Sequence, residues 1–492
     1  MRPHTVALLI LACLTSAVAA QTEPAPNENA VRLQHAATMQ LTPSTHPSDD
    51  PGYILYIDRP AWLERYPIPN DDPPATTPAV QRGPAAPAVA ASTYIFALGN
   101  VMNPNGFTVV PDGMNYAPGK FGFDMNTRPM GYVGDAVGVH AEGPIAFSVD
   151  LPEGNYKVTV NLGGPQEATT TVLAESRRLF FEKIHTAAGK SQTVDFLVNI
   201  RNSKVPPPPT NAPGGSEVRL NTLDNPLTWD DKLSLEFSGT NPSVQTIKIE
   251  PAPANTLTVF IMGDSTVTDQ PRDPGASWGQ MLPAFFKDTV AIANHATSGE
   301  TMKSSITGLR LDKVLSQIKP GDYLLIQYGH NDEKQSWPQT YVDPETTFKA
   351  YIGVFIAEAR RKGATPVIIS PMERSSGNKP DANSHGGFPK AYQEVAAEQK
   401  VAFIDLWSQS KIMYAAMGPD LPAAFNDQTH HKTYGAYEIA KLIATGIRAN
   451  KLPLAKQLRD DFKDMDPAHP DKLADFTTPM NISGTGRAPQ GN

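Results

Sequence analysis

The 492-residue sequence contains a single cysteine, Cys13, which lies among its first 20 residues. We expect residues 1–20 to be an export signal, because Arg2 precedes a short apolar run that ends in the small residues Ala19 and Ala20. After removal of that signal the chain would have no thiol, which excludes disulfide bonds and cysteine catalysis. A secreted or periplasmic location is therefore expected.

Positive charge is also scarce, with 42 Lys and Arg residues against 50 Asp and Glu residues and a net charge of -8. A nucleic-acid surface requires a basic stripe, so no nucleic-acid partner is expected. The apolar run in the predicted signal is too short to span a bilayer comfortably, and the sequence contains no other candidate, so no membrane span is expected.

Large apolar side chains are few in residues 21–91, which are rich in Pro, Ala, Asp and Thr. Such a composition buries too little apolar surface to offset the entropy of an ordered chain. The composition therefore predicts a linker that is largely disordered.

Alternating patterns typical of short β-strands occupy residues 92–253, without a long helical pattern between them. Several short strands separated by turn residues favour an all-β sandwich domain. The clearest strands are expected at 145–149, 156–160, 193–198, 233–237 and 245–249.

From residue 254 to 455 the pattern changes to continuous apolar runs that alternate with helical stretches. Such runs are typical of parallel strands buried on both faces, so this part is expected to be an α/β domain with a doubly wound sheet. Strands are expected at 257–262, 290–293, 323–327, 366–370 and 401–405, helices at 344–362 and 389–400, and a C-terminal tail at 456–492.

The first of these strands ends in Gly263-Asp264-Ser265. A serine on a turn at the rim of a sheet is well placed to act as a nucleophile, because the backbone N–H of the same turn can face a developing oxyanion. Ser265 is therefore the candidate nucleophile, and Asp264 is a supporting residue that could order the turn. The alternative is an ordinary turn with a capping serine.

Asp427 precedes His430 by three residues, just before a helix expected from about residue 433. This spacing lets the carboxylate accept the Nδ1–H of the imidazole and leaves Nε2 as a base toward a serine. The alternatives are a surface loop and a metal site made by Asp427, His430 and His431, which is disfavoured because consecutive histidines rarely point the same way.

Two further residues follow strands of the same sheet. Gly299 comes after the strand at 290–293, and Asn331 after the strand at 323–327. A glycine N–H and an asparagine amide are both suitable donors to an oxyanion, although each residue is also common in ordinary turns.

Taken together and in this order, Ser265, Gly299, Asn331 and His430 resemble the four blocks of the SGNH, or GDSL-type, hydrolase family, over about residues 256–450. The resemblance implies a three-layer flavodoxin-like parallel sheet and a serine esterase that needs no metal or other cofactor. It also implies a triad of Ser265, His430 and Asp427 and an oxyanion hole formed by Ser265, Gly299 and Asn331.

Residues 263–267, 294–296 and 327–332 look most similar to the rhamnogalacturonan acetylesterase branch, some members of which carry a galactose-binding-like β-sandwich. The branch usually has Gly-Arg-Ser at its second block, whereas this chain has Gly299-Glu300-Thr301. An arginine that could meet an acidic sugar is thus replaced by a carboxylate.

The expected function is an exported serine carbohydrate esterase that removes acetyl groups from a plant cell-wall polysaccharide, either pectin or rhamnogalacturonan or xylan. The expected partner is the acetylated polysaccharide or oligosaccharide. Trp278 and Trp337 could line a sugar cleft or pack in the core. The alternatives are a lipase, a thioesterase or a peptidoglycan deacetylase of the same fold, and a non-catalytic carbohydrate-binding envelope protein.

Overall fold

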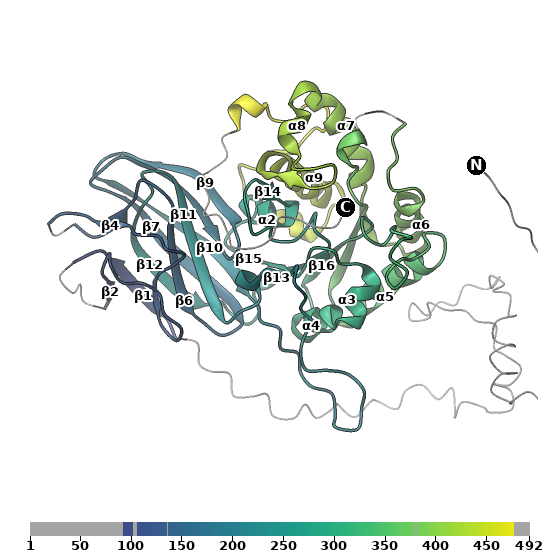
Figure 1. The fold of residues 1–492 in the computed structure, drawn as a ribbon, viewed down its shortest axis with the longest axis horizontal. Helices are drawn as coiled ribbons and strands as arrows, with labels where there is room; N and C mark the ends of the chain where they lie inside the picture. Colours follow the sequence, from purple (N-terminus) through teal and green to yellow (C-terminus); the bar gives the residue numbers. More distant parts are fainter. Residues whose placement is uncertain (1–91, 102–105, 135, 378, 380, 477–492) are drawn as a thin grey trace, which may run out of the picture. The chain divides into compact units, whose positions relative to one another are not determined.

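A computed structural model describes residues 92–101, 106–134, 136–377, 379 and 381–476 (Figure 1). The predicted signal at 1–20, the predicted linker at 21–91 and the last part of the predicted tail lie outside the described residues.

The centre of the hydrolase half is a parallel sheet whose strand order is β18-β17-β16-β13-β15. In chain order this is the 2-1-3-4-5 arrangement of a flavodoxin-like sheet, and the α/β fold expected from the sequence is confirmed. The chain reverses its direction of winding between β13 and β16, and α/β sheets typically bind their ligands at the carboxyl ends of the strands that flank such a point. The strands are β13 (Leu257–Gly263), β15 (Val290–Asn294), β16 (Tyr323–Gln327), β17 (Thr365–Ile369) and β18 (Ala402–Ile404).

Helices cover both faces of this sheet. Successive side chains of a strand point to opposite faces, so the apolar strands present apolar side chains on both faces, and helices bury them. Val259 and Ile261 of β13 belong to one apolar core, whereas Phe260 and Met262 belong to another. The first core contains α2 (Trp278–Met281), α7 (Leu406–Met417), α8 (Leu421–Ala424) and α9 (Thr433–Ala449). The second contains α3 (Met302–Thr307), α4 (Arg310–Gln317), α5 (Thr347–Arg361) and α6 (Phe388–Gln399).

The preceding region is the expected β-sandwich, with an apolar core between two largely antiparallel sheets. One sheet contains β1 (Tyr94–Leu98), β2 (Thr108–Val110), β4 (Met130–Gly131), β5 (Val139–His140), β7 (Gly154–Gly164), β10 (Lys190–Ile200) and β12 (Ser243–Pro251). The other contains β3 (Phe121–Phe123), β6 (Ile145–Asp150), β8 (Ala168–Ala174), β9 (Arg178–Thr186) and β11 (Lys232–Thr240).

The two halves share one sheet, which the sequence did not predict. β10 of the sandwich pairs with β15 of the parallel sheet, with Val198 opposite Ile292 (Figure 1). The expected boundary between residues 253 and 254 falls between β12 and β13 in the chain, yet the hydrogen-bonded sheet runs across it as twelve strands.

The described part of the predicted tail packs against both halves. Leu458 and Met465 are buried in the hydrolase core. Arg459 donates hydrogen bonds to the carbonyl oxygens of Phe180 in the sandwich and Phe286 in the hydrolase, at 2.8 and 3.1 Å. Up to residue 476 this segment therefore fastens the two halves together.

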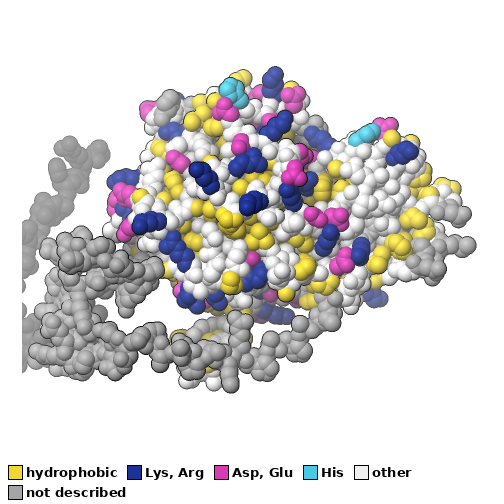
Figure 2. Space-filling view, turned by 180° about the vertical axis from the view of Figure 1, so that it is seen from behind, with side chains coloured by type: hydrophobic (Ala, Val, Ile, Leu, Met, Phe, Trp, Pro, Cys, Tyr) yellow, Lys and Arg dark blue, Asp and Glu magenta, His cyan; other side chains and the backbone are white. Residues whose placement is uncertain are grey.

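None of the helices in the described residues is long and apolar enough to cross a membrane. On the face seen in Figure 2, Lys and Arg side chains are intermingled with Asp and Glu side chains.

Candidate active site

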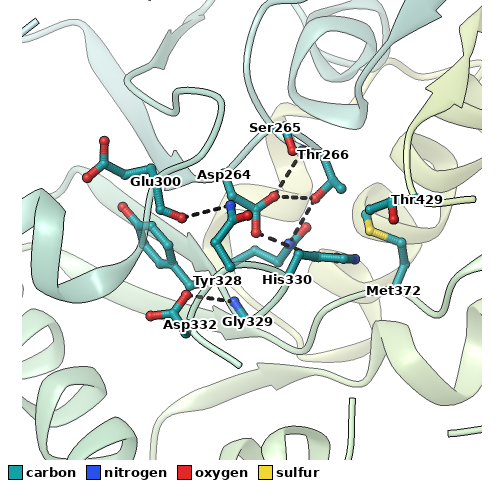
Figure 3. A network of polar contacts seen from close by, with 12 residues as sticks. Asp264, Ser265, Thr266, Glu300, Tyr328, Gly329, His330, Asp332, Met372 and Thr429 are labelled. Carbon is teal, nitrogen blue, oxygen red and sulfur yellow. Dashed lines mark hydrogen bonds and ion pairs between the residues drawn. The ribbon is translucent and has the colours of Figure 1, made fainter. Parts of the chain in front are cut away.

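The turn that carries Ser265 follows β13 directly and is ordered by the neighbouring carboxylate. Oδ1 of Asp264 accepts hydrogen bonds from the backbone N–H of Thr266 at 2.9 Å and from its hydroxyl at 2.8 Å (Figure 3). The carbonyl oxygen of Ser265 accepts a hydrogen bond from the side-chain amide of Gln270. Gly263 is required just before the turn, because a Cβ there would lie 2.6 Å from the carbonyl oxygen of Gln327.

The structure brings Ser265, His430 and Asp427 into one line of hydrogen bonds. Nε2 of His430 lies 2.7 Å from Oγ of Ser265, and Nδ1 lies 2.8 Å from Oδ2 of Asp427. A carboxylate can only accept, so Nδ1 carries the hydrogen and Nε2 accepts from the serine hydroxyl. This is the tautomer that a general base requires.

Asp427 is held as a carboxylate. Burial would raise its pKa, but hydrogen bonds from the His430 ring, the His430 N–H and the Thr429 N–H hold the pKa well below its usual range. The pairing with His430 therefore keeps its charge throughout the neutral pH range.

Asp264 has a second partner, which follows the neighbouring strand β16. Its Oδ2 lies 3.4 Å from Nδ1 of His330, and both side chains are fully buried (Figure 3). Although burial opposes ionisation, His330 and Thr266 lower the pKa of Asp264, whereas burial lowers the pKa of His330. Asp264 thus links the Ser265 turn to the loop after β16.

The two other predicted donors come from neighbouring strand ends. Gly299 has a φ of 76°, a conformation that favours glycine, and a Cβ there would lie 3.0 Å from Leu223. The Asn331 amide donates one hydrogen bond to the carbonyl oxygen of Glu300 at 3.1 Å, which anchors it beside the Gly299 turn. Its second N–H hydrogen remains available as a donor.

Comparison with known proteins identifies the family of the hydrolase half. Residues 261–437 match the GDSL-like lipase/acylhydrolase family. The chain is 36% identical over 222 residues to the rhamnogalacturonan acetylesterase RhgT of Bacillus subtilis, and the match covers 41% of this chain and 94% of that protein. The chain belongs to the GDSL-like lipase/acylhydrolase family.

A second relative of this GDSL-family chain, the probable rhamnogalacturonan acetylesterase YesY of Bacillus subtilis, is 35% identical over 211 residues. That match covers 41% of this chain and 96% of the relative. Among solved structures, the YxiM protein of Bacillus subtilis matches with 26% identity and a TM-score of 0.40, covering 74% of this chain and 99% of that one. The family match and the relatives named as acetylesterases show that the GDSL-family chain is a carboxylic ester hydrolase of the SGNH type.

Glu300 follows Gly299 directly, and its side chain turns away from Ser265 in this GDSL-family esterase (Figure 3). Its carboxylate lies 2.8 Å from Nε of Arg310, and burial raises its pKa. The same Arg310 contacts both carboxylate oxygens of Asp224, which also accepts a hydrogen bond from Thr297 at 2.7 Å. Asp224 belongs to the segment that precedes β11, so the sandwich half supports the Gly299 turn.

The sandwich also supports the Ser265 turn through a buried ion pair that sequence analysis missed. Arg178 of β9 and Asp269 are both 0% exposed, with Nε and Oδ2 2.8 Å apart. The other oxygen of Asp269 accepts from the Asn294 amide at 2.8 Å, and the same amide donates to the carbonyl oxygen of Val267. Nothing in the local pattern signals such a pair, because its partners are 91 residues apart.

His431, Trp278 and Trp337 lie outside the triad and the proposed oxyanion hole. His431 points into the core, where Nε2 lies 2.8 Å from the Tyr414 hydroxyl, and burial lowers its pKa to about 3. Trp278 is 1% exposed and donates to Gln327, so it is a core residue. Trp337 is only partly buried and lies under the ammonium group of Lys334. Among the described residues, no three or more His, Cys, Asp or Glu side chains are arranged to hold a metal ion.

Proposed function

We propose that this esterase removes acetyl groups from an acetylated plant cell-wall polysaccharide, such as rhamnogalacturonan, other pectins or xylan. The observation that carries the proposal is the line of hydrogen bonds from Ser265 through His430 to Asp427, with a spacing of 2.7 and 2.8 Å. The substrate class is supported by two relatives whose names include rhamnogalacturonan acetylesterase, which are 36% and 35% identical over the 222 and 211 residues that they match.

In the proposed reaction the Ser265 hydroxyl attacks the carbonyl carbon of the acetyl ester while Nε2 of His430 removes its proton. The tetrahedral intermediate collapses to an acetyl-enzyme as His430 returns the proton to the leaving sugar oxygen. Water, activated by the same nitrogen, then releases acetate and restores the serine. Asp427 holds the ring and stabilises its protonated form.

The proposed oxyanion hole consists of the N–H groups of Ser265 and Gly299 and the amide of Asn331. Its members come from three neighbouring strand ends, and the two turns beside Ser265 and Gly299 are fixed by buried charges. Losing one donor of this kind typically costs about 2.7–4 kcal/mol of transition-state stabilisation.

Export is part of the proposal and rests on the composition of residues 1–20. Expression of the full chain in a bacterium with a periplasm, followed by N-terminal sequencing of the product, tests it. A processed chain that starts near Gln21 in the periplasm or medium is expected, and an unprocessed cytoplasmic product would contradict export.

The central experiment measures acetate release from acetylated rhamnogalacturonan, acetylated homogalacturonan and acetylated xylan by the wild type and by Ser265→Ala. The wild type should release acetate, and the variant should be slower by roughly 10⁴-fold or more. Longer acyl esters, assayed in parallel, should be poorer substrates; a preference for them would indicate a lipase or thioesterase. Retention on the polysaccharides without acetate release would indicate a binding protein.

A further inference from the structure

Lys334 lies in the loop after β16 that also contains Asn331, and its ammonium group has no hydrogen-bond partner among the described residues. It follows Asn331 by three residues, and its Nζ lies 4.3 Å from the centroid of the Trp337 ring. This nitrogen is enclosed, and within the described part of the chain it has no hydrogen-bond partner. A cation–π contact replaces only part of the hydration that an ammonium group loses on burial.

The lysine borders two neighbouring hollows. The larger, with a volume of about 620 Å³, is lined by Lys334, Arg374, Ser375, Asp427, Gln428 and Thr429. The smaller, of about 430 Å³, is also lined by Lys334, together with residues that include Glu333 and His385. Since Asp427 binds the His430 ring, the larger hollow begins at the Asp427 end of the triad.

The other charged groups around these hollows are already paired. Arg374 donates to the carboxylate of Glu333 and to Thr429 and Ser384. Glu333 also contacts His385 at 2.8 Å. The carboxylate of Asp427 accepts three hydrogen bonds from its own loop.

Lys334 differs from these paired groups, because its ammonium group has no hydrogen-bond partner among the described residues. Burial, together with the nearby Arg374, lowers the pKa of Lys334, as expected for an ammonium group without a close counter-ion. An incoming carboxylate would give it a charge-assisted hydrogen bond.

We propose that Lys334 and the hollow beside it bind the carboxylate of a uronic acid unit next to the acetylated sugar. This inference rests on the proposed function and narrows it, because it selects an acidic polysaccharide over a neutral one such as xylan. Glu300 does not oppose such binding, since its carboxylate faces Arg310 and not the triad.

The test compares acetylated oligogalacturonate with the same oligosaccharide after methyl esterification of its carboxyl groups. The ratio of kcat/KM for the acidic over the esterified substrate is measured for the wild type, Lys334→Met and Lys334→Arg. The wild type should prefer the acidic substrate by roughly tenfold or more, as typical for a hydrogen bond between charged groups. Lys334→Met should lose this preference, and Lys334→Arg should keep much of it. The preference should weaken as salt is added.

Lys411→Met is the matched control, because Lys411 also lies 4.3 Å over a tryptophan ring, that of Trp407, but lines neither hollow. It should keep the wild-type ratio. An unchanged ratio in Lys334→Met, or a wild type without preference, would overturn the proposal.

Binding without turnover separates this inference from the proposed function. Calorimetry of Ser265→Ala should show tighter binding of the acidic than of the esterified oligosaccharide, and Ser265→Ala/Lys334→Met should bind both equally weakly. If the wild type hydrolyses no acetyl ester but Ser265→Ala still prefers the acidic sugar, the proposed function fails and the subsite stands. Equal binding of the two sugars by Ser265→Ala overturns the subsite.

Discussion

The two sides of Ser265 use positive charge in opposite ways. On the side of the sandwich, Arg178 and Arg310 are sealed between the two halves and contact Asp269, Asp224 and Glu300. Lys334, in contrast, lines a hollow, and its ammonium group lies over the Trp337 ring without a hydrogen-bond partner among the described residues. Arginines buried against carboxylates between the two halves hold the fold, whereas a lysine that lines a hollow without a hydrogen-bond partner is the proposed contact for a ligand.

The sealed side shows what the buried charges do for the site. Arg178 acts through Asp269 on the Ser265 turn, and Arg310 acts through Glu300 and Asp224 on the Gly299 turn. Arg201 completes this cluster, with its guanidinium group 4.6 Å from the centroid of Trp229 and 4.0 Å from Asp269. Buried ion pairs add little net stability, so their value here lies in the geometry that they impose on two turns.

The largest expected effect is the loss of activity on replacement of His430. His430→Ala should lower kcat for p-nitrophenyl acetate by roughly 10⁴-fold or more, because the base for Ser265 is lost. His431→Phe, which changes the adjacent ring in the core, should retain kcat within about tenfold. Steady-state kinetics of the two purified variants provides the check, and equal losses in both would refute the assignment of the base.

The next largest effect concerns stability. Arg178→Met removes the buried ion pair on the sandwich side and leaves Asp269 buried without its closest counter-ion. Removal of one partner of a buried pair typically costs about 3–5 kcal/mol of unfolding free energy. The loss is measured by urea denaturation. As control, Arg361→Met removes a largely exposed ion pair with Glu358 and should cost less than about 1 kcal/mol. Similar losses in the two variants would contradict the comparison.

A smaller effect concerns the pH dependence of stability. Burial lowers the pKa of His431 from 6.5 to about 3, so the folded chain resists a proton that the unfolded chain accepts. The contribution of His431 to the unfolding free energy is therefore complete above about pH 6.5 and is lost as the pH falls toward 3, by on the order of a few kcal/mol.

His431→Phe should be less stable at neutral pH, because the Tyr414 hydroxyl loses its partner, but its stability should depend less on pH over this window. Urea denaturation at pH 7, 5.5 and 4.5 measures both quantities. A variant that keeps the full pH slope of the wild type would show that another group is responsible.

The sequence predicted the parts of the molecule that have a local pattern. The apolar runs at 257–262 and 323–327 became β13 and β16, and the helical pattern at 344–362 became α5. The residues proposed for the site could be named because each sits at the end of such a strand or just before a helix.

Long-range contacts could not be predicted in this way. Arg178 looks like an ordinary surface cation in the sequence, because its burial and its pairing depend on Asp269, which lies 91 residues away in the chain. The pairing of β10 with β15 has no local signal either, since Val198 and Ile292 are each part of a plain apolar strand.

That pairing has a practical consequence for anyone who wishes to isolate the esterase. A truncated chain beginning near residue 254 would expose the edge of β15 that pairs with β10, and the apolar surface that β9 covers. It would also leave Asp269 without Arg178. Unpaired strand edges of this kind template association with other chains. The truncated fragment should therefore aggregate on expression, and the sandwich should be treated as part of the enzyme and not as an appended module.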